Sequence, residues 1–165
     1  MDSARVLRHL TTGQRATRRK FPVAALLAIE TAIQGGELRH SGEVRFAVEH
    51  ALEPMSVLRG ETPRERAVAI FTRLRVWDTE HNSGVLIYVL LADHAVEIVA
   101  DRGIHKKVAQ EAWQAICRHM ETEFRAGRFE AGALGGIVAV HELLARHFPA
   151  SARNPDELPN RPVVL

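Results

Sequence analysis

Asp78, Asn82 and Asp101 are the side chains of this 165-residue chain whose types and spacing best suit binding chemistry. They flank two apolar runs, which a turn around Asp93 connects. Because the connection is only a few residues long, the two runs are expected to pair as an antiparallel hairpin. That pairing places Asp101 opposite Gly84–Val85, so the three side chains should gather at one end of the sheet.

Carboxylate and amide oxygens gathered in this way are typical ligands of a hard divalent cation, Ca²⁺ or Mg²⁺. Zinc is a weaker candidate, because no His/Cys pair shows ligand spacing. Each residue also has a structural interpretation: Asp78 as a turn residue, Asn82 as part of an Asn-Ser-Gly turn, and Asp101 as a helix cap. The residues alone leave both interpretations open.

The elements that must position these residues predict a three-layer α/β/α sandwich around a small mixed sheet. A strand is expected over 43–49, less enclosed than two further strands over 84–91 and 95–101. The strand over 84–91 is apolar on both faces, so helices should cover both sides of the sheet. Helices are expected over 22–39, from a capping box at Thr62–Glu65 onward, over 105–128 and over 130–146.

The basic residues are concentrated at the N-terminus, although the whole chain has a net charge of only +2. Residues 1–21 hold six basic residues and one acidic residue, whereas the remainder is slightly acidic. We interpret 1–21 as a solvated basic arm, 22–149 as the folded domain and 150–165 as an extended tail. If this is right, deleting residues 1–20 should leave the thermal stability nearly unchanged.

The charge pattern also indicates a kind of partner. Loose attraction through residues 1–20 suits an anionic membrane surface or an unidentified protein partner, and specific recognition of nucleic acid is not expected. The longest uninterrupted apolar run, VLIYVLLA, is far shorter than the about 20 residues that a membrane-spanning helix needs. Residues 1–21 lack the apolar core of a signal peptide. We therefore expect a soluble, cytoplasmic protein, peripheral to a membrane at most.

The single cysteine, Cys117, has helical spacing to Trp113 and Met120. This spacing favours a buried, inert thiol over a nucleophile. Trp77 and Trp113 are both expected in the core. No GxGxxG motif and no P-loop is present, so the sequence gives no sign of a nucleotide site.

Three segments of the chain resemble the TPM domain family, in the order in which the family has them. The resemblance spans about residues 22–149, and its most specific element is T-x-x-N-x-G-V-L-I at Thr79–Ile87. It implies a central mixed sheet flanked by helices. The segments are SGEVRFAVE (41–49), FTRLRVWDTEHNSGVLIYVLLADHAVEIVADRGI (71–104), and the stretch from Trp113 to Pro149 that contains FRAGRFEAGALGGIVAVHELLARHFP.

The resemblance also carries functional expectations. Phosphatase activity is ascribed to plant thylakoid-lumen members, other members assist membrane complexes, and divalent cations are associated with the fold. By position, the resemblance implies a metal site at Asp78, Asn82 and Asp101, with Glu43 as an addition. Many members have an export signal and a membrane anchor, and we expect neither here.

Two functions follow from these observations. The favoured one is a divalent-cation-binding accessory or interaction module of TPM type. The alternative is a metal-assisted phosphatase acting on phosphate monoesters, in which the cation polarises the phosphate and positions water. In that case Arg102 or Arg45 would bind the phosphate and neutralise the developing phosphoryl charge.

Overall fold

The computed structural model describes residues 3–151 and 155–165. Its centre is a four-stranded sheet in the order β3-β2-β1-β4. β1 pairs in parallel with both β2 and β4, whereas β2 and β3 form the expected antiparallel hairpin. The sheet is therefore mixed, as predicted. The strands are β1 (Glu43–Glu49), β2 (Gly84–Leu90), β3 (Ala95–Ala100) and β4 (Val163–Val164).

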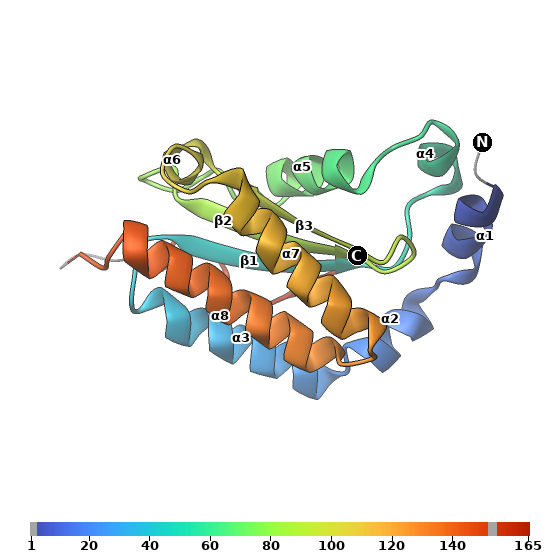
Figure 1. Cartoon of the computed structure of the whole chain (residues 1–165), viewed down its shortest axis with the longest axis horizontal. Helices are drawn as coiled ribbons and strands as arrows, with labels where there is room; N and C mark the ends of the chain where they lie inside the picture. The colour runs from blue at the N-terminus through green and yellow to red at the C-terminus, as the bar shows by residue number, and fades with distance from the viewer. Residues whose placement is uncertain (1–2, 152–154) are drawn as a thin grey trace.

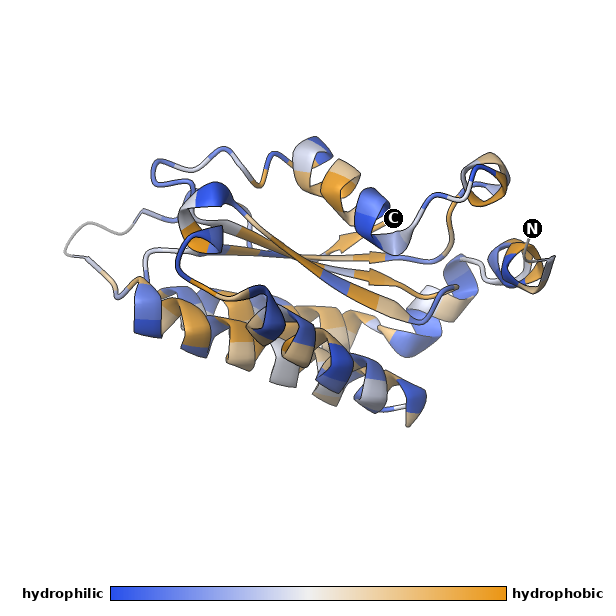
Figure 2. Ribbon diagram, turned by 45° about the horizontal axis from the view of Figure 1, so that its top comes forward, coloured by the Kyte–Doolittle hydropathy of each residue, from blue (hydrophilic) through white to orange (hydrophobic). Residues whose placement is uncertain are grey.

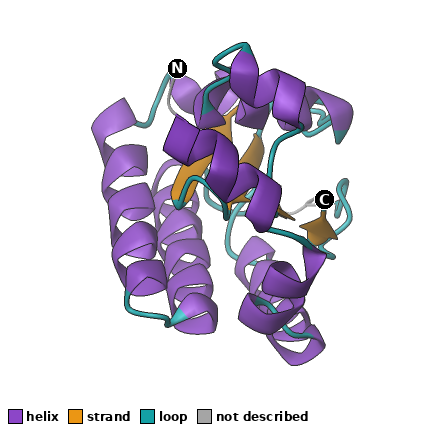
Figure 3. Ribbon diagram, turned by 90° about the vertical axis from the view of Figure 1, so that its right-hand side faces the viewer, coloured by secondary structure: helices purple, strands orange, loops and turns teal. Residues whose placement is uncertain are grey.

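Helices lie on both faces of the sheet, which confirms the predicted α/β class. Helices α3, α7 and α8 cover one face, and α5 covers the other (Figure 1). The view in Figure 3, nearly along the strands, shows the sheet between these two layers. The helices are α1 (Ser3–Thr11), α2 (Gln14–Lys20), α3 (Val23–Glu37), α4 (Pro54–Leu58), α5 (Pro63–Arg73), α6 (Arg102–His105), α7 (Gln110–Arg125) and α8 (Phe129–His147). Among the described helices, none combines the length and the apolarity that crossing a bilayer requires.

The two faces of the sheet bury different side chains because successive residues of a strand point in opposite directions. In β1, Val44, Phe46 and Val48 pack with α3, α7 and α8, whereas Ala47 packs with α5. Figure 2 shows the strands as a mostly hydrophobic layer between two layers of helices. All seven residues of β1 are buried, so the prediction that this strand would be less enclosed was wrong. It lies between β2 and β4, which cover both of its edges.

Local signals fixed the start of α5 correctly. The Thr62 side chain accepts a hydrogen bond from the Glu65 N–H (3.2 Å), and the Glu65 carboxylate accepts one from the Thr62 N–H (2.8 Å). The helix expected over 105–128 is shorter than predicted. Residue His105 ends the short helix α6, and the long helix α7 begins only at Gln110. Trp113 on α7 is buried as predicted, whereas Trp77 is 46% exposed.

The helix expected over 22–39 is α3, which runs through Gly35 and Gly36 and ends at Glu37. Gly36 allows α8 to approach closely, because a Cβ there would collide with the His141 ring. His141 is itself hydrogen-bonded to His40 across the core (Nδ1···Nε2, 2.6 Å). Burial lowers the pKa of His40 to about 4 and that of His141 to about 3, so both rings are neutral.

The N-terminal segment is folded, in contrast to the expected solvated arm. Asp93, at the turn of the β2–β3 hairpin, accepts hydrogen bonds from Arg5 Nη2 (2.7 Å) and His9 Nε2 (3.0 Å). His9 Nδ1 accepts the N–H of Leu52 (2.9 Å), which leaves Nε2 as the donor to Asp93. Burial alone would raise the pKa of Asp93, but the hydrogen bonds from Arg5 and His9 outweigh it and hold the pKa below its usual range. Helix α1 is therefore attached to the hairpin turn.

Replacing Asp93 by alanine is expected to lower the free energy of unfolding by about 3 kcal/mol, because Arg5 and His9 would lose a nearly buried charged acceptor. Urea unfolding monitored by circular dichroism would measure the change. The matched control is Asp78→Ala, which removes an exposed ion pair with Arg75 and should have little effect. Equal stability of both variants and the parent would show that α1 does not depend on this attachment.

Candidate cation site

The hairpin mouth, defined here as Asp78, Asn82 and Asp101, lies at the end of β2 and β3. The main-chain N–H of Asp101 donates to the Gly84 carbonyl (2.9 Å), so Asp101 lies opposite Gly84 as predicted. Its Oδ1 accepts the N–H of Arg102 (2.7 Å) and caps α6. Its Oδ2 is buried and has no hydrogen-bond partner among the described residues. Asp101 thus caps the helix with Oδ1, while Oδ2 is left for a further ligand.

The Asn-Ser-Gly segment packs closely against the corner between β3 and α6. Asn82 has a left-handed backbone (φ 50°), and its carbonyl accepts the N–H of Gly103 (3.1 Å). A Cβ on Gly103 would lie 2.6 Å from the Asn82 carbonyl oxygen, and one on Gly84 would collide with the Val76 carbonyl. Only glycine fits without a shift of the backbone at either position. The T-x-x-N-x-G motif therefore has a packing role of its own.

The structure does not bring the four predicted ligands into one group. Asp78 lies on the loop surface, where it pairs with Arg75 (2.7 Å). Glu43 is in register with Gly84 on one side, and Asp101 lies beside Gly84 on the other. The backbones of Glu43 and Asp101 are thus two strand spacings apart, about 10 Å. The hairpin mouth stays a predicted cation site, whereas Glu43 belongs to a second group of oxygens.

This second group, the acidic cluster, consists of Glu37, Glu43 and Asp156. One carboxylate oxygen from each residue lies within 4.8 Å of the others. Glu37 is the last residue of α3, Glu43 is the first residue of β1, and Asp156 belongs to the C-terminal tail, residues 155–165. Both glutamates are buried and Asp156 is exposed, so solvent reaches the cluster from the Asp156 side.

The acidic cluster faces a small cavity of about 130 Å³, which Gln34, Leu38, Pro155 and Asn160 also line. The Asn160 side-chain amide donates to Asp156 Oδ2 (3.2 Å). Its carbonyl oxygen, Oδ1, is buried and has no hydrogen-bond partner in the described part of the chain. The cavity is therefore lined by three carboxylates and by the side-chain amides of Gln34 and Asn160.

The acidic cluster also holds the tail against the sheet. Glu43 Oε2 accepts the N–H groups of Leu158 (3.1 Å) and Glu157 (3.3 Å). Arg45, two residues further along β1, donates from Nη1 to the Pro159 carbonyl. Beyond these contacts, β4 pairs with β1. The tail, expected only to be extended, is in fact bound along the whole of β1.

Burial has a large effect on the carboxyl groups of the acidic cluster. Burial, with a smaller contribution from the charges of Glu43 and Asp156, raises the pKa of Glu37 to about 8, against the hydrogen bond from the Val44 N–H. Burial also raises the pKa of Glu43 to about 7, against the hydrogen bonds from the tail. Near neutral pH the cluster therefore retains protons when no cation neutralises it.

The two arginines expected to bind phosphate lie in different surroundings. Arg45 is buried under the tail, and burial lowers its pKa while attraction to Glu37 raises it. Arg102 is the exposed first residue of α6. Because Arg45 is covered and hydrogen-bonded to the Pro159 carbonyl, it is not open to a phosphate ligand as it stands.

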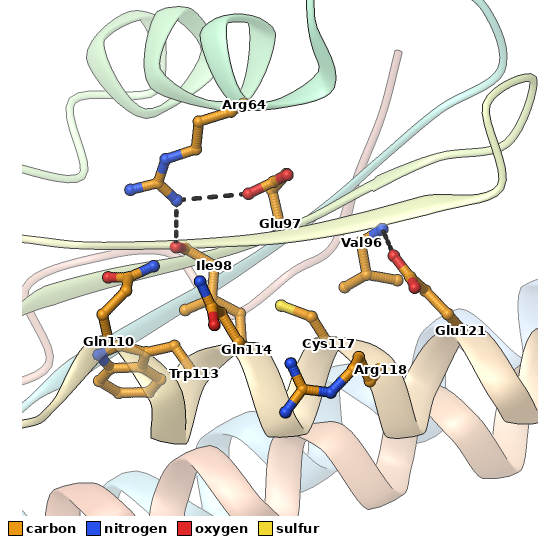
Figure 4. A pocket seen from close by; sticks show the side chains of 10 residues that line it. All are labelled: Arg64, Val96, Glu97, Ile98, Gln110, Trp113, Gln114, Cys117, Arg118 and Glu121. Carbon is orange, nitrogen blue, oxygen red and sulfur yellow. Dashed lines mark hydrogen bonds and ion pairs between the residues drawn. The ribbon is translucent and has the colours of Figure 1, made fainter.

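A larger cavity of about 380 Å³ lies along the outer edge of β3, between α5 and α7 (Figure 4). Two long side chains reach the main chain of β3 there. Arg64 donates to the Ile98 carbonyl (2.6 Å), and Glu121 accepts the Val96 N–H (3.0 Å). Burial raises the pKa of Cys117 to about 12, which keeps the thiol protonated and agrees with the predicted inert cysteine. Charged groups that cover a strand edge in this way protect it from pairing with other chains.

Sequence reasoning missed three residues of the cavity, namely Glu37, Asp156 and Asn160. The only signal available was the acidic pair Asp156–Glu157 in the proline-rich tail. That pair becomes informative only when the tail is known to lie next to β1. Glu43 was predicted as a metal ligand, but only from the family resemblance. It was expected beside Asp78, Asn82 and Asp101, whereas it lies beside Glu37 and Asp156.

Comparison with known proteins agrees with this architecture. The model of the TPM domain matches residues 24–143. The BA42 protein from the psychrophilic bacterium Bizionia argentinensis is 31% identical in sequence, with a TM-score of 0.75 over 88% of this chain and 95% of that one. The N-terminal domain of a protein from P. gingivalis is similar in fold alone, at 18% identity and a TM-score of 0.55 over 74% of this chain and 80% of that one. A comparison with curated proteins gave no match. Because the family model covers most of its length, the chain belongs to the TPM domain family.

Proposed function

We propose that this chain is a divalent-cation-binding accessory module, with the acidic cluster as its cation site. The observation that supports it best is the convergence of three carboxylate oxygens within 4.8 Å of one another. Ca²⁺ holds its oxygen ligands at about 2.3–2.6 Å, so two ligands on opposite sides of one ion are about 5 Å apart. The spacing of the cluster therefore suits a single ion, and Asn160 Oδ1 offers a fourth oxygen in the same cavity.

The charge of the site also suits a divalent cation. When Glu37, Glu43 and Asp156 are all ionised, their three negative charges and that of nearby Glu157 face one positive charge, that of Arg45. The remaining negative excess is unfavourable in a partly buried site unless protons or a cation neutralise it. A single Ca²⁺ or Mg²⁺ would balance most of it.

The accessory role follows from where the ligands come from. Glu37 and Glu43 belong to the body of the domain, whereas Asp156 and Asn160 belong to the tail. A cation bound to both sets would join the tail to the sheet. Such an ion would stabilise the surface formed by the tail and the sheet. This structural role, unlike catalysis, requires no nucleophile.

The alternative function, a metal-assisted phosphatase, needs a cation with an open arginine beside it to neutralise the phosphoryl group. Arg45 is the arginine whose charge acts on Glu37, and the tail covers it. We therefore favour binding over catalysis. The hairpin mouth is the rival location for the cation, since Asp101 Oδ2 is buried there without a partner among the described residues.

Adding Ca²⁺ to the metal-free protein is expected to raise the unfolding temperature, because the ion binds only the folded cluster. A ligand at a hundredfold excess over its Kd stabilises the folded state by about 2.7 kcal/mol. Glu37→Gln combined with Asp156→Asn should abolish the rise and the calorimetric heat of binding. The Glu37 side chain keeps an oxygen for the Val44 N–H in this variant, so the fold should survive.

The matched control is Asp78→Asn combined with Asp101→Asn at the hairpin mouth, which should leave Ca²⁺ binding intact. The reverse pattern, with binding lost only in the control, would place the cation at the hairpin mouth. No heat with Ca²⁺, Mg²⁺ or Mn²⁺ would refute cation binding altogether. Cation-dependent hydrolysis of p-nitrophenyl phosphate that is lost when Glu37→Gln and Asp156→Asn are combined would favour the phosphatase function.

The metal-free protein is expected to lose stability as the pH rises. Glu37 and Glu43 have folded-state pKa values of about 8 and about 7, above the ordinary value of 4.5, so the folded state binds more protons within this window. Stability should therefore fall from about pH 4.5 to about pH 8 and level off above it. Glu37→Gln should remove much of the fall, a relative gain on the order of 3 kcal/mol at about pH 9.

Urea unfolding of parent and variant at about pH 5 and about pH 9 would measure this difference, in which the contributions of other titrating groups cancel. The control is Glu142→Gln, which replaces an exposed glutamate of α8 and should follow the parent at both pH values. A parent protein as stable at the higher pH as at the lower would contradict the raised pKa values.

A further inference from the structure

Two adjoining apolar grooves lie where the end of α2, the start of α3 and the tail meet. Their volumes are about 640 Å³ and about 260 Å³. Val23, Leu26 and Val164 line both, so the two form one continuous surface, which we call the corner groove. The other lining residues are Thr17, Arg18, Phe21 and Pro22 in the first groove and Leu27, Glu30, Arg161 and Pro162 in the second.

The apolar side chains at the corner groove project into solvent. Val23 is 73% exposed, Leu27 is 57% exposed and Val164 is 47% exposed. On the same helix, Ala25 and Ile29 are fully buried in the core. Helix α3 is therefore apolar on its inner face and again on part of its outer face. Adjacent exposed apolar residues of this kind mark an interaction surface.

Arginine side chains surround these apolar residues. Arg18 lines the first groove and Arg161 lines the second. Arg15 and Arg19, also exposed, stand on α2 beside Arg18, and α2 has no acidic residue. The one acidic residue that lines the corner groove is Glu30.

The structure separates these arginines from the other basic residues of the N-terminus. Arg5 is hydrogen-bonded to Asp93, and Arg8 donates to the Ala92 carbonyl. Lys20 lies over the Phe129 ring at 5.0 Å. Arg15, Arg18 and Arg19 of α2, together with Arg161, therefore place positive charge next to the corner groove.

We infer that the corner groove is a docking surface for an anionic lipid bilayer. Projecting apolar side chains enter the boundary between headgroups and acyl chains, while arginines at the same level bind lipid phosphates. Attraction of this kind is strongest for anionic lipids and weakens with salt. An acidic protein partner would use the same arginines but would leave the exposed apolar side chains of Val23, Leu27 and Val164 without a role.

Cosedimentation with vesicles tests the inference. The full chain, in EDTA so that no cation is bound, should bind vesicles of roughly one-third phosphatidylglycerol in phosphatidylcholine and not vesicles of phosphatidylcholine alone. Binding should weaken as the salt concentration rises. The use of EDTA keeps the result independent of the proposed cation site, which is tested by calorimetry.

Two variants test the two components of the surface. Arg18→Glu combined with Arg19→Glu should reduce binding at least tenfold, and Val23→Ser combined with Leu27→Ser should also reduce it. The matched control is Arg59→Glu combined with Arg73→Glu, which makes the same change in net charge at exposed positions on the α4–α5 side and should bind as the parent does. All six positions are exposed, so circular dichroism should show unchanged folding in each variant.

Absence of binding to the anionic vesicles would overturn the inference. So would an equal loss in the control, which would indicate general charge attraction, or full binding by the serine variant, which would exclude the apolar contact. Binding of soluble polyglutamate in place of vesicles would assign the surface to an acidic protein partner and would overturn it as well.

Discussion

The parallel pairing of β1 with β2 is the constraint on which the rest of the structure depends. It aligns Glu43 with Gly84 and continues to Glu49 and Leu90. Parallel neighbours cannot be joined by a tight turn, so residues 50–83 must cross over the sheet, and they carry α4 and α5 over one face. The pairing leaves the far side of β2 to β3 and the far side of β1 to the tail. The acidic cluster forms at the start of β1, where the end of α3 and the tail meet.

Sequence reasoning succeeded where neighbours in the chain decide the structure. The short turn at Asp93 fixes the hairpin, and Val85 faces Ala100, within one residue of the expected register. The capping box at Thr62 needs only four consecutive residues. The helical spacing around Trp113 identifies a buried face because α7 packs against the sheet with one stripe. The expectation that Trp77 is buried was wrong, because Trp77 lies in a turn after the end of α5, where helical periodicity does not indicate which side chains are buried.

The acidic cluster was beyond sequence reasoning because its members meet only through long-range pairing. Glu43 and the tail residues that it binds are 114 and 115 positions apart. The strand that brings the tail to β1 has only two residues, Val163–Val164, too short for any alternation to show. The attachment of α1 depends in the same way on Arg5 and Asp93, which are 88 positions apart. Composition alone made the first 21 residues look like a solvated arm, although two of their arginines are used inside the fold.

The tail connects the two regions of the molecule that carry the functional proposals. At its start, Glu157 and Leu158 donate to Glu43, and this covering of Glu43 is part of what desolvates the carboxyl group and raises its pKa. The tail therefore acts on Glu43 in two opposite ways: covering the carboxyl group disfavours its ionised form, and the hydrogen bonds from the tail N–H groups favour it, with desolvation the larger effect. At the other end of the tail, Val164 forms a wall of the corner groove. Because one segment contacts both regions, a cation that joined Glu43 to Asp156 would also hold in place the strand that carries Val164 to the corner groove.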